Sequence, residues 1–240
     1  MLFSFEELRG YQIRAADGDI GSVDDVLFED TASTVRYLVV ETGSWLFGRK
    51  VLLAAAALGP VEHRARAITT GLTTRQVKDS PSIDSDQPVS RQQEEALHSY
   101  YDWPPYWYGT PPLGLAPYWG GVGLAPPPPA HDPVEREVAD MQRQQADPHL
   151  RSAREVIGYY VAAADSDIGH VEDLLVDDAD WMIRQLVIDT RNWLPGRKVL
   201  VDTDRLRSVD WAGRHIVLGM SRGEVESGPE FDRSLIAAGG

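Results

Sequence analysis

Apolar residues along this chain occur in short runs that are separated by turn-forming residues. β-Branched and aromatic side chains concentrate in four of these runs, at residues 10–15, 20–29, 34–42 and 49–54. Such runs are typical of strands. Asp17-Gly18-Asp19 separates the first two runs and has residue types that tolerate a left-handed backbone, so it predicts a turn. The third run is almost continuously apolar, which predicts a buried central strand.

The whole pattern returns later in the chain without a gap. GYQIRAADGDIGSVDDVLFED begins at Gly10, and GYYVAAADSDIGHVEDLLVDD begins at Gly158, 148 residues further on. Two copies indicate a duplicated domain, whereas a solenoid needs more repeats. The number and shortness of the strands predict a small β-barrel for each copy. We expect the two copies to pack as a pseudo-twofold pair, because duplicated domains often descend from a homodimer.

Short helices are predicted at both ends of each copy. Ser4-x-x-Glu7 and Ser152-x-x-Glu155 are capping-box patterns, which indicate a helical turn before each barrel. Further short helices are expected around residues 73–79 and 221–227. Gly21 interrupts a predicted strand, which indicates a bulge or a close backbone approach.

The predicted fold class is therefore all-β, with two small barrels in tandem, short flanking helices and a linker rich in proline and aromatic residues. The predicted boundaries are a first barrel at 1–82, a linker at 83–149, a second barrel at 150–232 and a tail at 233–240.

The linker divides into a short helix at 90–100, a Pro/Gly/aromatic segment at 100–129 and a charged spacer at 130–149. Proline in the middle segment excludes regular helix and sheet. Flexible spacers seldom contain tryptophan, so the rings either pack back on the barrels or dock a partner, which is another protein or a second copy of this chain. The candidate docking residues are Trp103, Tyr106, Trp107, Tyr118 and Trp119.

A second candidate surface comes from a block that recurs in both copies, Trp-Leu-x-Gly-Arg-Lys. Tryptophan with arginine favours a binding hot spot. The alternative is that the ring caps the barrel and the cations pair with neighbouring acids. The residues concerned are Trp45, Arg49, Lys50, Trp193, Arg197 and Lys198.

Charge and composition narrow the classes of partner. The net charge is −14, from 37 acidic and 23 basic residues, which disfavours nucleic acid and anionic lipid. There is no cysteine, so disulfides and thiolate sites are excluded and a reducing cytoplasm is favoured. No run of apolar residues is long enough for an integral membrane segment.

The motifs of common catalytic sites are missing from the sequence. It contains no Gly-x-Ser-x-Gly elbow, no Walker loop and no Gly-x-Gly-x-x-Gly. The acidic turn at Asp17 and Asp19 resembles the opening of a calcium loop, but Phe28 stands where that loop needs a carboxylate. We therefore predict no enzyme activity, no catalytic or metal-binding residue and no cofactor.

The ordered motifs resemble the PRC-barrel family. GYxxxAxDxxIGxVxDxL is followed by VRYLVV (RQLVID in the second copy) and WLxGRKVL, across about residues 4–82 and 150–232. The resemblance implies a domain similar to the cytoplasmic part of the photosynthetic reaction-centre H subunit and to the C-terminal domain of a ribosome-maturation factor. It therefore implies a protein-binding module without catalysis of its own.

Three hypotheses of function follow. The first is a non-catalytic protein-interaction, assembly or regulatory module, with a protein partner that the sequence does not identify. The second is a membrane-peripheral accessory protein of an electron-transfer or photosynthetic complex, which docks through residues 100–120. The third is a cation or small-ligand binder that uses the acidic turns at Asp17–Asp19 and Asp165–Asp167.

Overall fold

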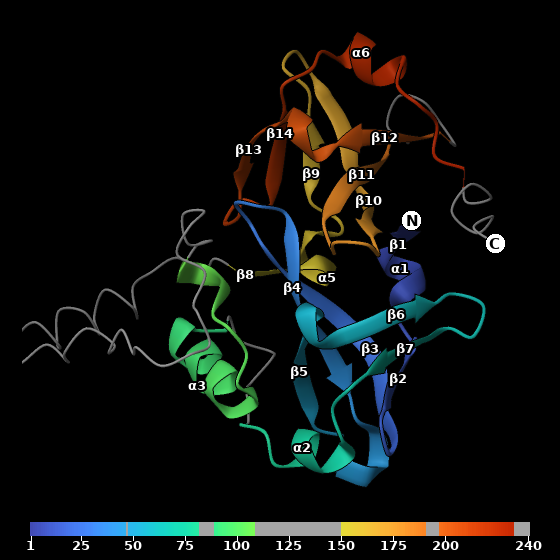
Figure 1. Cartoon of the computed structure of the whole chain (residues 1–240). Coiled ribbons are helices and arrows are strands. Elements are labelled where there is room, and N and C mark those ends of the chain that lie inside the picture. The colour runs from blue at the N-terminus through green and yellow to red at the C-terminus, as the bar shows by residue number, and fades with distance from the viewer. Residues whose placement is uncertain (47, 82–88, 109–149, 191–196, 233–240) are drawn as a thin grey trace, which may run out of the picture.

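Strands dominate the structure and form two mixed sheets, one for each repeat (Figure 1). The computed structural model describes residues 1–46, 48–81, 89–108, 150–190 and 197–232. The predicted all-β fold with two tandem repeats is confirmed. Among the described residues, none of the helices has the length and apolar character that crossing a membrane requires.

The first sheet has the strand order β5-β4-β3-β2-β7-β6. All neighbours are antiparallel except β2 and β7, which run parallel. Its strands are β2 (Gln12–Ala15), β3 (Gly18–Glu29), β4 (Thr34–Glu41), β5 (Lys50–Ala54), β6 (Leu58–Glu62) and β7 (Ala67–Thr70).

The second sheet repeats this order as β12-β11-β10-β9-β14-β13, again with one parallel pair, β9 and β14. The duplication that the sequence predicts is thus a duplication of topology. Its strands are β9 (Tyr160–Ala162), β10 (Asp167–Asp177), β11 (Ile183–Asp189), β12 (Lys198–Asp202), β13 (Leu206–Asp210) and β14 (His215–Leu218).

The helices are short and lie where the capping signals place them. Each repeat begins with one helical turn, and each ends with a short helix whose capping box is complete. The described helices are α1 (Phe5–Leu8), α2 (Thr74–Lys78), α3 (Arg91–Tyr101), α5 (Ala153–Val156) and α6 (Arg222–Glu226), with 3-10 turns η1 (Gly43–Leu46), η2 (Ala55–Ala57), η3 (Tyr106–Tyr108) and η4 (Thr203–Arg205).

Glycine inside the long strand of each repeat allows a close backbone approach. A Cβ atom added to Gly21 would lie 2.0 Å from the carbonyl oxygen of Glu41, and one added to Gly169 would lie 1.9 Å from that of Asp189. Neither distance is sterically possible. The close approach expected at Gly21 is therefore confirmed, and it recurs in the second repeat.

The two repeats exchange their first strands. β1 (Leu2–Ser4) precedes the first repeat in sequence but pairs with β10 of the second, and β8 (Leu150–Ser152) pairs with β3 of the first. The registers are equivalent, because Leu2 lies opposite Asp177 and Leu150 lies opposite Glu29. Each sheet thus gains a seventh strand from the other repeat. The expected pseudo-twofold packing is what the structure shows, through an exchange that the sequence did not reveal.

A pair of hydrogen bonds between the repeats lies where a twofold axis would pass. The N–H of Val35 donates to the carbonyl of Trp181, and the N–H of Ile183 donates to the carbonyl of Ser33, both at 2.8 Å. Val35 and Ile183 are equivalent positions, as are Ser33 and Trp181, so the two bonds are copies of each other. Ser33 and Trp181 both have positive φ, 51° and 58°, so the same turn recurs on each side.

A buried aspartate in each sheet receives the helical turn of the other repeat. Asp25 accepts hydrogen bonds from the Ser152 hydroxyl and from the backbone N–H of Arg154, at the start of α5. Asp173 accepts the equivalent bonds from Ser4 and from the N–H of Glu6, at the start of α1. Both aspartates follow a β-bulge that shifts the register of the strand. The bulge therefore directs each carboxylate at a helix N-terminus.

An aromatic ring meets a nitrogen-containing side chain at each side of the interface, and the two kinds of residue have exchanged positions. On one side the Phe3 ring lies 5.5 Å from that of His63, whose Nε2 is 3.1 Å from a carboxylate oxygen of Asp178. On the other side the Arg151 guanidinium lies 4.4 Å above the Trp211 ring and pairs with the aspartate equivalent to Asp178. The two residues in contact come from the same repeat on each side. The acid that pairs with them comes from the opposite repeat and is an aspartate in both cases.

The exchange joins the interiors of the repeats into one hydrophobic core. The core cluster runs from Phe3, Phe5 and Leu8 through both sheets to Ala153 and Val156. Phe5 and Leu8 are fully buried, although α1 is only one turn long. The helical turns are therefore held by burial against the opposite repeat, because helices of this length are not stable alone.

We predict that the two buried aspartates make stability depend on pH. Burial raises the pKa of Asp25 and of Asp173 above the ordinary value of 3.8, against the lowering effect of their hydrogen bonds. The folded chain therefore binds more protons than the unfolded chain just above that value, and the contribution of these groups falls as pH rises. The advantage of wild type over the D25N/D173N variant should be larger at about pH 4.5 than at about pH 7, measured as unfolding free energy.

Asp17 provides a control of opposite sign. Its pKa is lowered by the hydrogen bond from the Thr74 N–H, so its contribution is lost as pH falls. The advantage of wild type over D17N should shrink from neutral to acid pH. If the D25N/D173N difference also shrank on acidification, the interface would not contain aspartates of raised pKa.

Candidate functional site

An aromatic layer covers the outer face of the first sheet. Helix α3 and the turn that follows it lie against this face, beside β4 and β5 (Figure 1). Their apolar side chains form a second core, separate from the one inside the repeats. Its buried members are Leu27, Tyr37, Val39, Leu52, Ala54, Val89, Leu97 and Leu150, with Tyr101, Trp103 and Tyr106 packed at its border.

Beneath this layer is a buried polar network. The Tyr37 hydroxyl lies 3.0 Å from a carboxylate oxygen of Glu94, to which it donates, and 2.7 Å from Nε2 of His98. The Tyr106 hydroxyl donates to the same Glu94 oxygen. Arg91 lies 3.3 Å from the other oxygen of Glu94. Glu94 is fully buried, so this network ties α3 to the sheet through one carboxylate.

Burial fixes the protonation of the groups around Glu94. Desolvation, together with the nearby Glu94 charge, raises the pKa of Tyr37 and of Tyr106, so both phenols stay protonated and donate. Desolvation lowers the pKa of His98, so its imidazole is neutral at pH 7. The network therefore contains hydrogen-bond donors and one cation, Arg91, around one acid.

The second repeat is polar where the first carries this layer. Tyr37 and Ala54 are cross-strand neighbours under the layer. Their equivalents, Gln185 and Asp202, are also cross-strand neighbours, but their side chains hydrogen-bond each other at 2.7 Å. A polar pair thus replaces an apolar pair, and this difference in sequence distinguishes the outer face of the second sheet from that of the first.

The recurring arginine of the Trp-Leu-x-Gly-Arg-Lys block holds the end of each repeat. Arg49 donates to the carbonyls of Ser80 and Pro81, at 2.7 and 2.9 Å. Arg197 donates in the same way to the Gly228 carbonyl at 3.0 Å. The recurrence of this arginine thus has an explanation within the fold.

The other predicted site residues are distributed over separate places. Lys50 pairs with Asp24, and Lys198 pairs with Glu172. The backbone of Trp45 lies in η1. Trp103, Tyr106 and Trp107 come together around His98, while Tyr118, Trp119 and Trp193 lie outside the described residues.

The acidic turns have a structural partner in both repeats. Asp17 accepts hydrogen bonds from the N–H and the hydroxyl of Thr74 at the start of α2. Asp165 accepts from the N–H of Arg222 at the start of α6. These carboxylates hold the closing helices, which accounts for their recurrence without a bound cation.

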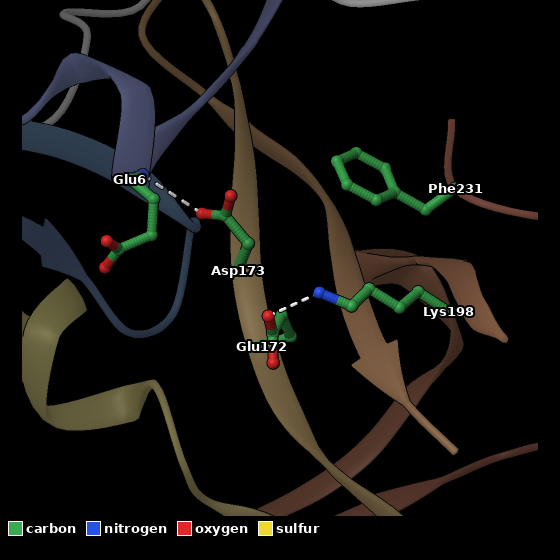
Figure 2. A pocket seen from close by; sticks show the side chains of 5 residues that line it. All are labelled: Glu6, Glu172, Asp173, Lys198 and Phe231. Atoms are coloured by element: carbon green, nitrogen blue, oxygen red, sulfur yellow. Dashed lines mark hydrogen bonds and ion pairs between the residues drawn. The ribbon is translucent and has the colours of Figure 1, made fainter. Parts of the chain in front are cut away.

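A polar pocket of about 300 Å³ opens between the repeats on the second sheet (Figure 2). Glu6 comes from α1 of the first repeat, Asp173 and Glu172 from β10, Lys198 from β12, and Phe231 from the segment beside β12. Lys198 is bonded to Glu172, and Asp173 accepts from the backbone of Glu6. The first repeat has Arg154 in place of Glu6, and it pairs with Asp24 at 2.9 Å.

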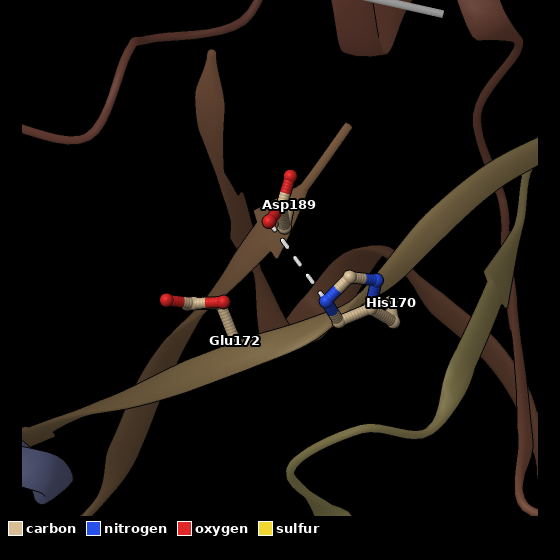
Figure 3. Close-up of side chains that lie close together, drawn as sticks. All are labelled: His170, Glu172 and Asp189. Carbon is tan, nitrogen blue, oxygen red and sulfur yellow. Dashed lines mark ion pairs between the residues drawn. The ribbon is translucent and has the colours of Figure 1, made fainter. Parts of the chain in front are cut away.

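Next to this pocket, three side chains offer ligand atoms within 4.8 Å of one another: His170, Glu172 and Asp189 (Figure 3). They converge because His170 lies opposite Asp189 and a bulge follows at Glu172. Lys198 already pairs with Glu172, and Nε2 of His170 lies 3.8 Å from a carboxylate oxygen of Asp189. A metal ion bound here would compete with both contacts. Within this cluster, Glu172 is thus already paired with a cation.

We predict that Tyr37→Phe loosens α3 from the sheet. The change leaves buried Glu94 and His98 without the phenol, which should cost about 1–3 kcal/mol. Hydrogen exchange over Arg91–Tyr101 and chemical denaturation would measure the effect. Gln185→Ala, at the equivalent and less buried position, should cost below about 1 kcal/mol. Equal losses, or unchanged exchange in α3, would contradict the role assigned to this network.

Comparison with known families agrees with the order of the sequence motifs and with the repeated topology. The model of the PRC-barrel domain matches residues 1–70 and 148–219. None of the curated proteins compared with the chain matches it. The two matched segments make up more than half of the chain and coincide with the two sheets, so the chain belongs to the PRC-barrel family.

Proposed function

We propose that this chain is a non-catalytic interaction and assembly module that binds a partner protein through the aromatic layer on its first repeat. The family supports a non-catalytic module. One observation carries the choice of surface. The rings of Trp103, Tyr106 and Trp107 are half-exposed, and they lie on a layer that has no counterpart on the second repeat among the described residues.

These rings are packed against other side chains, which favours binding. Trp103 stacks on Tyr101 with ring centroids 4.3 Å apart. Tyr106 is fixed below by Glu94 and by the Arg36 guanidinium, which lies 4.1 Å from its ring. Aromatic side chains that are already ordered lose little conformational entropy when a partner covers them.

The recurring loops are a weaker choice for the binding surface. Arg49 and Arg197 have their guanidinium groups on backbone carbonyls of their own repeat. A partner that used them would have to compete with these bonds. We therefore place partner binding at the aromatic layer first and at the loops second.

The proposal predicts that partner capture depends on the aromatic layer. Immobilised wild-type chain and the W103A/W107A variant would be compared by quantitative capture from lysate of the source cells. Loss of at least about 1–2 kcal/mol of binding per anchoring ring is expected. Tyr160, which is 68% exposed on the second repeat, provides a matched control as Y160A.

Proteins retained by wild type and Y160A but lost by W103A/W107A would support the proposal, provided that thermal melting shows both variants folded. Equal retention by all three chains would contradict it. Sedimentation of the purified chains measures self-association, so it shows whether the partner that is lost is a second copy of this chain.

A further inference from the structure

A pocket of about 320 Å³ opens on the aromatic layer, between the second half of α3 and the turn that leads into η3. This size is at the lower end of the range for small-ligand sites. The residues that the argument uses are Glu95, His98, Asp102, Trp103, Pro105 and Trp107, which all line it.

The walls of the pocket are aromatic rings set at steep angles. The His98 ring lies 4.8 Å from that of Trp107 and 5.8 Å from that of Trp103, with interplanar angles of 63° and 82°. Rings at such angles form a corner, whereas rings that sandwich a flat group are parallel. A compact cation fits a corner of ring faces, while a planar guanidinium prefers to stack flat.

The charge of the pocket is negative. Glu95 and Asp102 are exposed at its edge, and no Lys or Arg is among the described residues that line it. Asp102 is held there by a left-handed backbone (φ 56°), and its N–H caps α3 by donating to the His98 carbonyl. The imidazole of His98 is neutral because burial lowers its pKa, so it does not repel a cation.

The same group of rings already binds cations within the chain. The Arg91 guanidinium lies 4.4 Å from the Trp107 ring centroid, and that of Arg36 lies 4.1 Å from Tyr106. These contacts show that one face of each of these two rings already interacts with positive charge. The chain as a whole carries a net charge of −14, which attracts basic partners.

We propose that this pocket receives the side-chain ammonium of a lysine, methylated or unmethylated, presented by the partner protein. The inference rests on the proposed function and deepens it, because it names the chemistry that the aromatic layer recognises. The alkyl chain of the lysine would lie against Trp103 and Pro105, and the ammonium would lie between Trp107 and the carboxylates of Glu95 and Asp102.

Binding of defined probes to the full chain tests the proposal. The probes are the methylamides of Nα-acetyl-lysine, of its Nε-trimethyl form and of Nα-acetyl-norleucine, which has an alkyl chain without charge. Nuclear magnetic resonance of the tryptophan indole groups would measure affinity. Saturable binding of both lysine probes is expected, with norleucine bound at least about tenfold more weakly.

Two variants separate charge from ring. E95Q/D102N keeps the shape of the pocket, and W107L removes one wall, so each should weaken the lysine probes about tenfold. D204N and Y160A, at exposed positions of the second repeat, should bind as wild type does. Thermal melting of every variant identifies any that has lost its fold. If W107L has lost its fold, the more conservative variant W107F is tested in its place.

Equal binding of the norleucine and lysine probes would overturn the proposal, as would lysine binding that E95Q/D102N leaves unchanged. Binding of free choline without binding of either lysine probe would show a small-molecule site and would also overturn it. If no lysine probe binds while W103A/W107A still loses its partner, this inference fails and the proposed function stands.

Discussion

The packing of the two repeats depends on two buried carboxylates. Each lies in one repeat and binds a helical turn of the other. Asp25 and Asp173 lie at strand bulges, where they accept the N–H groups and serine hydroxyls of helical turns that come from the other half of the chain. The turns are too short to be stable alone. Without these acceptors, the N–H groups and serine hydroxyls at the start of the turns would lose their hydrogen-bond partners from the other repeat. The serine of each Ser-x-x-Glu pattern therefore also takes part in the interface between the repeats.

The two repeats share one topology, but their outer faces differ in polarity. Where Tyr37 and Ala54 support an added layer in the first repeat, Gln185 and Asp202 bond each other and leave the second polar. A buried glutamate would be costly under such a layer. One oxygen of Glu94 accepts from two phenols, and the other lies 3.3 Å from Arg91. The apolar and polar pairs occupy equivalent cross-strand positions, so one part of the asymmetry lies at two neighbouring residues of each sheet.

The strands, the turns and the repeat could be predicted from sequence because their signals are local. Gly21 is an example, since a glycine inside a strand indicates close contact, and the structure shows that contact. The strand exchange could not be predicted, because Leu2 carries no information about which of two equivalent strands it will join. The role of Glu94 was also missed, since its burial depends on a helix packing against a sheet more than fifty residues away in sequence. The available signal was that Tyr37 of the first repeat corresponds to Gln185 of the second.

The strand exchange also sets an order of events during synthesis. Leu2 pairs with Asp177, so β1 has no partner strand until most of the residues that follow it have been synthesised. Until Leu150–Ser152 emerges, β3 likewise lacks the pairing that β8 provides. Contacts of such long separation form late, and an open strand edge invites pairing with other chains in the meantime. The acidic surface of the chain opposes such encounters, because nascent copies with a net charge of this sign repel each other.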